Sequence, residues 1–223
     1  MKTNFTNHFK KAIYLFVFAG YISAFAGSYE DFFVAVKQDD APKIRQLLQR
    51  GFDPNTIDAK GQTGLYLALQ EPSQKVAQVL AEWPKTNVNL LNSAGESVLM
   101  IAALKGNEGA VGSLLRRGAD VNKTGWTPLH YAATSGQLTI LTQLLENHAY
   151  IDAESPNGST PLMMAAMYGT PQAVKLLIDA GADPLLKNQQ GITAIDFARR
   201  ANRTESIELL ATAIRRKQAT GKW

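Results

Sequence analysis

Residues able to bind a metal ion or act in catalysis are few and widely separated in this chain of 223 residues. It has three histidines, His8, His130 and His148, and no cysteine. The lack of cysteine excludes structural disulfides, thiolate metal sites, cysteine nucleophiles and a lipid-modified cysteine anchor. A zinc site on His130 and His148 would need carboxylates at convergent spacing, and none is evident.

Other signatures of catalysis are missing from the sequence as well. It contains no nucleophile elbow, no glycine loop suited to phosphate and no candidate catalytic triad. We therefore expect no catalytic residue, no cofactor and no bound metal. An enzyme of unfamiliar type is the alternative, and a turnover screen on the purified protein would test it.

One short segment recurs along the chain. Its fullest copy reads TPLHYAA from Thr127 to Ala133 and is followed by Gly136. The hydroxyl residues that begin the five copies stand at positions 63, 97, 127, 160 and 193, which gives steps of 34, 30, 33 and 33. A period of this length is typical of stacked repeats rather than of a globular domain.

Each copy has the features of a helix pair. Thr127 can cap a helix with its hydroxyl, and Pro128 suits the first helical position, where a missing N–H costs nothing. Gly136 is expected to end this helix, and the apolar residues between Leu138 and Leu145 form the stripe of a second one. The stretch 118–122 and its equivalents should form projecting hairpins.

The motif and its period resemble the ankyrin repeat over about residues 28–215. The resemblance implies an all-α fold with short β-hairpin fingers, an ankyrin-repeat solenoid of about six stacked helix pairs. The expected units are a capping repeat at 28–57, four repeats at 58–91, 92–123, 124–155 and 156–188, a second capping repeat at 189–215, and a basic tail at 216–223. The resemblance also implies that His130 braces neighbouring hairpins by hydrogen bonds. Asp196, in the same slot of its own unit, is then a helix-end variant rather than a catalytic acid.

The first 26 residues have the shape of a signal peptide. Lys2, Lys10 and Lys11 precede an apolar run from Ala12 to Ala26. This run is shorter than the roughly 20 apolar residues of a spanning helix, and small residues precede a possible cut after Ala26. We expect cleavage there, a periplasmic or secreted protein, and no stable membrane insertion. An uncleaved leader would instead make the protein a membrane-tethered adaptor.

The basic character of the chain comes mostly from this leader. The whole chain has 23 Lys and Arg against 19 Asp and Glu, and removal of the three leader lysines leaves 20 against 19. A nucleic-acid partner would require Lys and Arg spread over one face of the repeats, which the sequence does not show. We expect no nucleic-acid binding.

A protein partner is the expectation that follows from the resemblance. Members of this family usually bind along the concave side, which the finger tips and the exposed face of the first helices form. Transferred by position, the candidate contact residues are Trp126, Tyr168, Met167, Ile192, Leu104, Lys105 and Glu96. Exposed Trp, Tyr and Met are favoured interface anchors. The alternative for Trp126 and Tyr168 is that they fold down on their own helices.

The hairpin before Trp126 is shorter than the others. Gly118 and Gly125 are 7 residues apart, whereas Gly181 and Gly191 are 10 apart. We expect a stunted finger, either as tolerated loop variation or as a shape suited to one partner. The predicted function is a non-catalytic scaffold, monomeric when free, that binds another protein. An inhibitor of the immunity type, which would cap an exported enzyme or toxin, is the alternative.

Overall fold

Paired helices make up the chain. The computed structural model describes residues 27–71 and 74–220, so the predicted leader at 1–26 and the last three residues of the predicted tail lie outside the described residues. A first helix at 27–37 precedes the labelled ones. These are α2 (Ala41–Gln49), α3 (Gly64–Gln70), α4 (Gln74–Glu82), α5 (Val98–Lys105), α6 (Glu108–Arg116), α7 (Pro128–Ser135), α8 (Leu138–Glu146), α9 (Pro161–Met167), α10 (Pro171–Asp179), α11 (Ala194–Arg200) and α12 (Thr204–Thr220).

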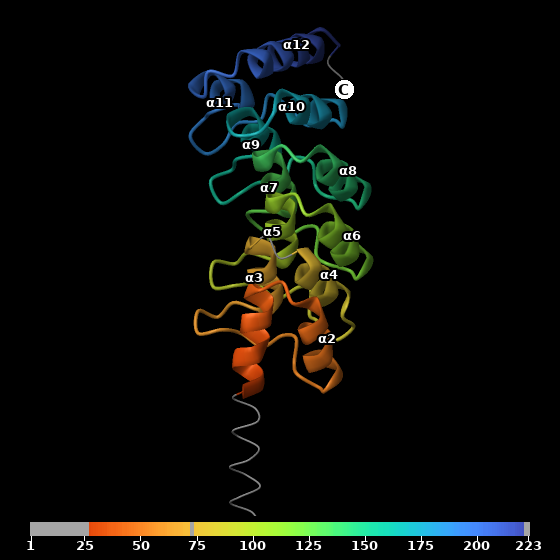
Figure 1. Cartoon of the computed structure of the whole chain (residues 1–223). Coiled ribbons are helices and arrows are strands. Elements are labelled where there is room, and N and C mark those ends of the chain that lie inside the picture. Colours follow the sequence, from red (N-terminus) through yellow and green to blue (C-terminus); the bar gives the residue numbers. More distant parts are fainter. Residues whose placement is uncertain (1–26, 72–73, 221–223) are drawn as a thin grey trace, which may run out of the picture.

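The six helix pairs of the described residues stack in a single column, as the repeat period predicted. Figure 1 shows α3, α5, α7, α9 and α11 in one row and the even-numbered helices in a second row beside it. Within the first row, α5 packs against α7, α7 against α9 and α9 against α11. The loops before these helices project from the first row, and the two ends of the stack lie far apart (Figure 1). The predicted solenoid is therefore confirmed.

The ends of the first-row helices follow from local chemistry. The hydroxyl oxygens of Thr63 and Thr160 each accept a hydrogen bond from a backbone N–H in the first turn. Proline is the first residue of α7 and of α9, where its missing N–H leaves no partner unsatisfied. Gly136 ends α7 in the left-handed conformation, with φ 70°. Pro128 and Gly136 act as predicted, whereas the Thr127 hydroxyl accepts no backbone cap bond and lies 2.9 Å from Nδ1 of His130 instead.

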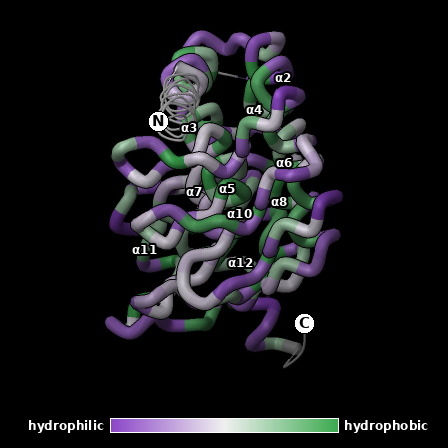
Figure 2. Tube along the Cα trace, turned by 90° about the horizontal axis from the view of Figure 1, so that it is seen from below, coloured by the Kyte–Doolittle hydropathy of each residue, from purple (hydrophilic) through white to green (hydrophobic). Residues whose placement is uncertain are grey.

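The core lies between the two rows. Leu99, Leu129 and Leu162, one from each of three successive units, are fully buried. Burying one such leucine contributes about 1.5–3 kcal/mol. Ala132 and Ala165 are buried at the contacts of the first row, where their small side chains allow neighbouring helices to approach closely. Figure 2 looks along the stack and shows hydrophilic residues at loop tips and outer turns.

Asparagine side chains join each unit to the next on the loops that follow the second-row helices. The side-chain N–H of Asn55, Asn89 and Asn122 donates to a backbone carbonyl one unit along, and the side-chain oxygen accepts from a backbone N–H there. The backbone partners are Lys85 and Asn87 for Asn55, Gly118 and Asp120 for Asn89, and His148 and Tyr150 for Asn122. At the fourth position Asp152 only accepts, from the N–H of Asp183 at 3.1 Å. These bonds set the register between units.

The fingers differ from the predicted β-hairpins. In the described residues they are tight turns rather than strands, with isolated antiparallel bridges at Ile57–Thr63 and Leu91–Ser97. Two backbone bonds close each of four turns, as from Ser155 N to Ser159 O at 3.0 Å and from Gly158 N to Ser155 O at 2.8 Å. Five residues are too few for a strand ladder. The shortened finger at 119–126 makes no such closing bond among the described residues.

No helix within 27–71 and 74–220 has the length and hydropathy needed to span a membrane.

Close packing between α7 and the turn after α9 predicts opposite effects of two glycine substitutions. A Cβ on Gly169 would lie 2.3 Å from the carbonyl oxygen of Ala133, one unit away. We expect Gly169→Ala to lower the free energy of unfolding by about 1–3 kcal/mol, because two backbones must separate. Gly112 lies inside α6, where an added Cβ meets only the tip of Arg116 at 3.4 Å. Gly112→Ala should raise the free energy of unfolding by about 0.5–1 kcal/mol.

Urea unfolding measures both effects, and the dependence of the free energy of unfolding on urea concentration should be the same in both variants as in the wild type. A neutral Gly169→Ala variant would contradict the close packing of the first row.

Candidate functional site

The face that the first-row helices present next to the fingers is the candidate site. Three of these helices end in side chains that are exposed or half-buried: Leu104 and Lys105 at the end of α5, Met167 at the end of α9 with Tyr168 directly after it, and Arg199 and Arg200 at the end of α11. We call these six residues the inner face. Counted from the capping hydroxyl, Leu104, Met167 and Arg200 share one position of the repeat, Lys105 and Tyr168 share the next, and Arg199 stands one position earlier. Because α5, α7, α9 and α11 pack in order, these residues follow one another along the stack.

Tyr168 is the most exposed of the predicted aromatic contacts. It follows the last residue of α9, and 56% of its surface is accessible. Its backbone carbonyl accepts a hydrogen bond from Arg203 at 3.4 Å, which ties the position to the last unit. A tyrosine held at its backbone and free at its ring can bury a large area on a partner at a low entropic cost.

Trp126 is less available than its sequence position suggested. It is half-buried and packs against the core, and its ring meets the ring of His130 edge-on with a centroid distance of 5.2 Å. The indole is therefore held largely by its own unit. The alternative in which Trp126 folds down on its own helix describes its position better than a free-standing anchor does.

The structure leaves Ile192 little surface for contact with a partner. Ile192 is 7% exposed. Its N–H donates to the side chain of Asn188 at 3.0 Å, and its carbonyl accepts from the N–H of Asn188 at 3.0 Å. The closed turn leaves the side chain buried.

Glu96 is the centre of a polar cluster that crosses three units. Its Oε2 accepts hydrogen bonds from the hydroxyl of Tyr66 at 2.9 Å and from Nδ2 of Asn92 at 2.8 Å. Its Oε1 accepts from the hydroxyl of Tyr131 at 2.8 Å. Gln70 donates to the Tyr66 oxygen at 3.0 Å. The structure thus adds two tyrosines to the candidate site that sequence reasoning missed.

A signal for this cluster was present in the sequence. Tyr66 precedes Glu96 by 30 residues and Tyr131 follows it by 35, so each is about one repeat away. Residues one period apart lie side by side in a stack. The relation becomes visible only when the units are aligned and polar residues are compared across them.

Burial and hydrogen bonding oppose each other at this cluster. Burial raises the pKa of Glu96, but the hydrogen bonds from Asn92, Tyr131 and Tyr66 outweigh it and the pKa is lowered. The pKa values of Tyr66 and Tyr131 are raised, first by burial and then by their bonds to Glu96. The cluster at neutral pH is therefore a carboxylate that two protonated phenols hold in place.

His130 has the structural role that the resemblance implied. The side chain is fully buried. Its Nδ1 accepts from the N–H of Thr127 at 3.2 Å, and its Nε2 lies 2.9 Å from the carbonyl oxygen of Ser159 in the next finger. The neutral form with a proton on Nε2 satisfies both contacts. Burial lowers the pKa of His130 to about 4.

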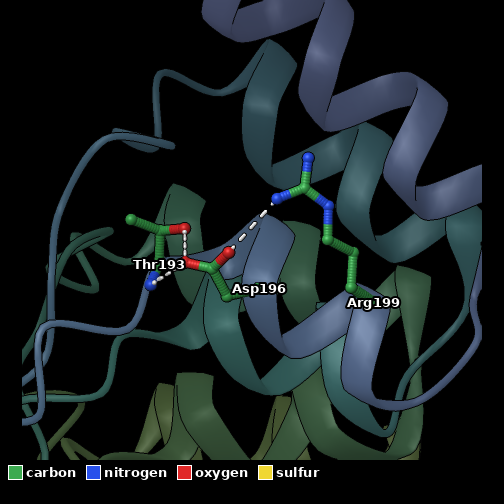
Figure 3. A network of polar contacts seen from close by, with 3 residues as sticks. All are labelled: Thr193, Asp196 and Arg199. Carbon is green, nitrogen blue, oxygen red and sulfur yellow. Dashed lines mark hydrogen bonds and ion pairs between the residues drawn. The ribbon is translucent and has the colours of Figure 1, made fainter.

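Asp196 occupies the same slot in the last unit. Its Oδ2 accepts from the N–H of Thr193 at 3.1 Å and from the Thr193 hydroxyl at 2.6 Å, and its Oδ1 pairs with Arg199 at 3.3 Å, as Figure 3 shows. The Thr193 bonds lower the pKa of Asp196. The acid closes a helix end, as the resemblance implied. Within the part of the chain that the structure describes, no group of three or more His, Cys, Asp or Glu could hold a metal ion.

Comparison with known proteins places these features in a family context. The family model for ankyrin repeats, three copies long, matches residues 32–124, 77–155 and 140–219. The chain is similar to the human transient receptor potential cation channel subfamily A member 1, with 32% identity over 166 residues. That match covers 69% of this chain and 15% of the channel. The chain thus spans a small part of this curated relative.

Two solved structures resemble the whole stack. An ankyrin repeat domain from Acinetobacter baumannii has a TM-score of 0.71 and 28% identity, and the match covers 82% of this chain and 96% of that one. A chain from the complex of a predatory endopeptidase of Bdellovibrio bacteriovorus with an immunity protein has a TM-score of 0.68 and 29% identity. That match covers 82% of this chain and 97% of that one.

The low pKa of His130 predicts a loss of stability in mild acid. The ordinary pKa is 6.5 and the folded value is about 4, so between these limits the unfolded chain binds more protons and the free energy of unfolding decreases as the pH is lowered. From pH 7 to pH 5 this contribution falls by about 2 kcal/mol. His130→Asn should be less stable at pH 7 and should lose this part of the pH dependence.

The matched control is His148→Asn. His148 is exposed and has φ 65°, a conformation that Asn tolerates. The free energy of unfolding of the control, measured with urea across this pH range, should change with pH as it does in the wild type. If the free energy of unfolding of His130→Asn also changes with pH as in the wild type, other groups cause the acid sensitivity.

Proposed function

Because the chain belongs to the ankyrin-repeat family, we propose that it is a non-catalytic scaffold that binds another protein in an exported compartment. Ankyrin repeats mediate protein–protein interaction, and the fold is typically an interaction scaffold without catalytic activity. The described residues match this use, since the ionisable groups with shifted pKa values close helix ends, link units or lie in the Glu96 cluster.

The row of side chains on the inner face carries the proposal. Tyr168 is accessible over 56% of its surface, and Lys105 is exposed two helix pairs before it with Leu104 half-buried beside it. These side chains come from rigid helices, so little freedom is lost on binding. A stable complex buries about 1,600 Å² in total, which an elongated face of several units can supply.

The exported compartment is the second part of the proposal. It is supported by the leader, in which three lysines precede an apolar run that ends at Ala26. A cleaved leader would release a protein that begins at Gly27.

Inhibitory binding is a second candidate function. It is favoured by the likeness to a chain from the complex of a predatory endopeptidase with an immunity protein, which extends over 97% of that chain. In this version the inner face would cap an exported enzyme or toxin. The scaffold and the inhibitor share the same surface and differ in the partner.

Substitution of Tyr168 tests the inner face. We expect Tyr168→Ala to leave the thermal midpoint nearly unchanged, because the ring is exposed, and to weaken partner binding about tenfold or more, as the loss of an aromatic anchor does. The measurement is recovery of partner from the exported fraction in a pull-down, followed by titration. An assay of the recovered partner with and without this protein separates inhibition from scaffolding.

Tyr150→Ala is the matched control. Tyr150 is 69% exposed but follows α8 of the second row, away from the inner face. Its loss should leave recovery at the wild-type level. If Tyr168→Ala binds as well as the wild type, the inner face is not the binding surface.

N-terminal sequencing of the protein from cells tests export. The expected mature protein starts at Gly27, since the small residue Ala26 precedes the cut. A chain that keeps residues 1–26 and sediments with membranes would replace the exported form with the tethered adaptor.

A further inference from the structure

The Glu96 carboxylate has capacity for one more donor. Its Oε2 accepts from two groups, Tyr66 and Asn92, while its Oε1 accepts from Tyr131 alone. A carboxylate offers about four lone-pair sites. One site on Oε1 is therefore unused by the described residues.

Among the described residues, no Lys, Arg or His side chain forms an ion pair with Glu96. The described residues form four ion pairs: Lys43–Asp31, Lys175–Asp179, Arg199–Asp196 and Lys217–Asp183. None of them includes Glu96. Its donors are two phenols and an amide, all neutral. Buried or half-buried charges in proteins are usually paired, because neutral hydrogen bonds replace only part of the lost hydration.

Exposed apolar side chains share a hollow with two of the residues that donate to this carboxylate. Ile57 and Leu91 occupy the same position of two neighbouring fingers and are 52% and 53% exposed. Together with Tyr66 and Asn92 they line a hollow of about 70 Å³. Tyr66 and Asn92 are also the two donors to Oε2 of Glu96. The hollow and the carboxylate are therefore parts of one surface.

We propose that Glu96, Tyr66 and Tyr131 form a receptor for an arginine side chain of the partner protein, and that Ile57 and Leu91 hold an apolar residue next to that arginine. The inference rests on the proposed function and adds the chemistry of the partner segment to it. The receptor lies at the finger side of the units at 58–91 and 92–123.

Arginine fits this receptor for two reasons. A guanidinium is planar, always charged and weakly hydrated, so it can donate to Oε1 at a low desolvation cost. It also stacks on aromatic faces. Tyr131 is half-buried and can provide one, whereas Tyr66 is 5% exposed and contributes by holding Glu96 through its hydroxyl. Its donation would pair the charge and use the remaining acceptor site.

Peptide titration of the purified full chain tests this inference without knowledge of the partner. The probes are acetyl-Gly-Leu-Arg-Gly-amide and the same peptide with citrulline, which has the shape of arginine but no charge. We expect the arginine peptide to shift the NMR signals of Tyr66, Tyr131 and Glu96 and to bind about tenfold more tightly than the citrulline peptide, since a charge-assisted bond is about twice as strong as a neutral one.

Glu96→Gln should abolish the difference between the two peptides. Glutamine keeps a hydrogen-bond acceptor and the side-chain length but removes the charge. The matched control is Glu154→Gln, which makes the same change of charge at an exposed residue of another finger. If the role of Glu96 were purely structural, the substitution would change the thermal midpoint of the variant, but the wild type would show no preference for the arginine peptide over the citrulline peptide. That preference therefore remains decisive even if Glu96→Gln is unstable.

The possible outcomes separate the inference from the proposed function. Equal binding of the two peptides to the wild type, or no binding of either at millimolar concentration, overturns the arginine receptor and leaves the pull-down result untouched. Failure to recover any partner overturns the proposed function, while the peptide preference is still judged by itself. Arg199 and Arg200 of a second copy are another source of arginine. Self-association that Glu96→Gln abolishes in light scattering would overturn the assignment to a different protein.

Discussion

Burial between neighbouring units is the interaction on which the rest of this structure depends. A single helix pair exposes one apolar stripe on each side, and it is covered only when the next pair packs against it. Leu99, Leu129 and Leu162 are fully buried because each unit has a neighbour. Alanines in the first row set the distance between units. The position of every surface residue along the stack follows from this spacing.

Hydrogen bonds between polar groups fix the position of each unit relative to the next, which apolar burial alone does not specify. Asn55, Asn89 and Asn122 bond across successive loops on one side, and His130 bonds across the fingers on the other. The slot of His130 holds Tyr66 in an earlier unit and Asp196 in the last. His130 reaches the next finger, whereas Asp196 bonds within its own unit to Thr193. Asp196 thus stabilises only its own helix, while His130 also links its unit to the next finger.

Departures from the repeat pattern concentrate in the first half of the finger side. Tyr66 replaces histidine in its slot and turns its hydroxyl toward Glu96, while Ile57 and Leu91 place apolar groups on two adjacent fingers. Ile57 and Leu91 supply no helix cap and lie outside the buried core, whereas the ring of Tyr66 packs in the core and only its hydroxyl reaches Glu96. These three residues change the chemistry of the surface, which is how a shared scaffold acquires an individual partner.

The sequence by itself determined the number of units, the helix ends and the buried leucine stripe. Capping hydroxyls, Pro128 and Gly136 act within a few residues of themselves, so their effect can be predicted without a fold. Only the tertiary structure decided which surface candidates are available, burying Ile192, half-burying Trp126 and leaving Tyr168 exposed. It also brought Tyr66 and Tyr131 to Glu96. These outcomes depend on the distance and rotation between units. Both arise from the packing of whole helix pairs and cannot be predicted from the sequence of one repeat.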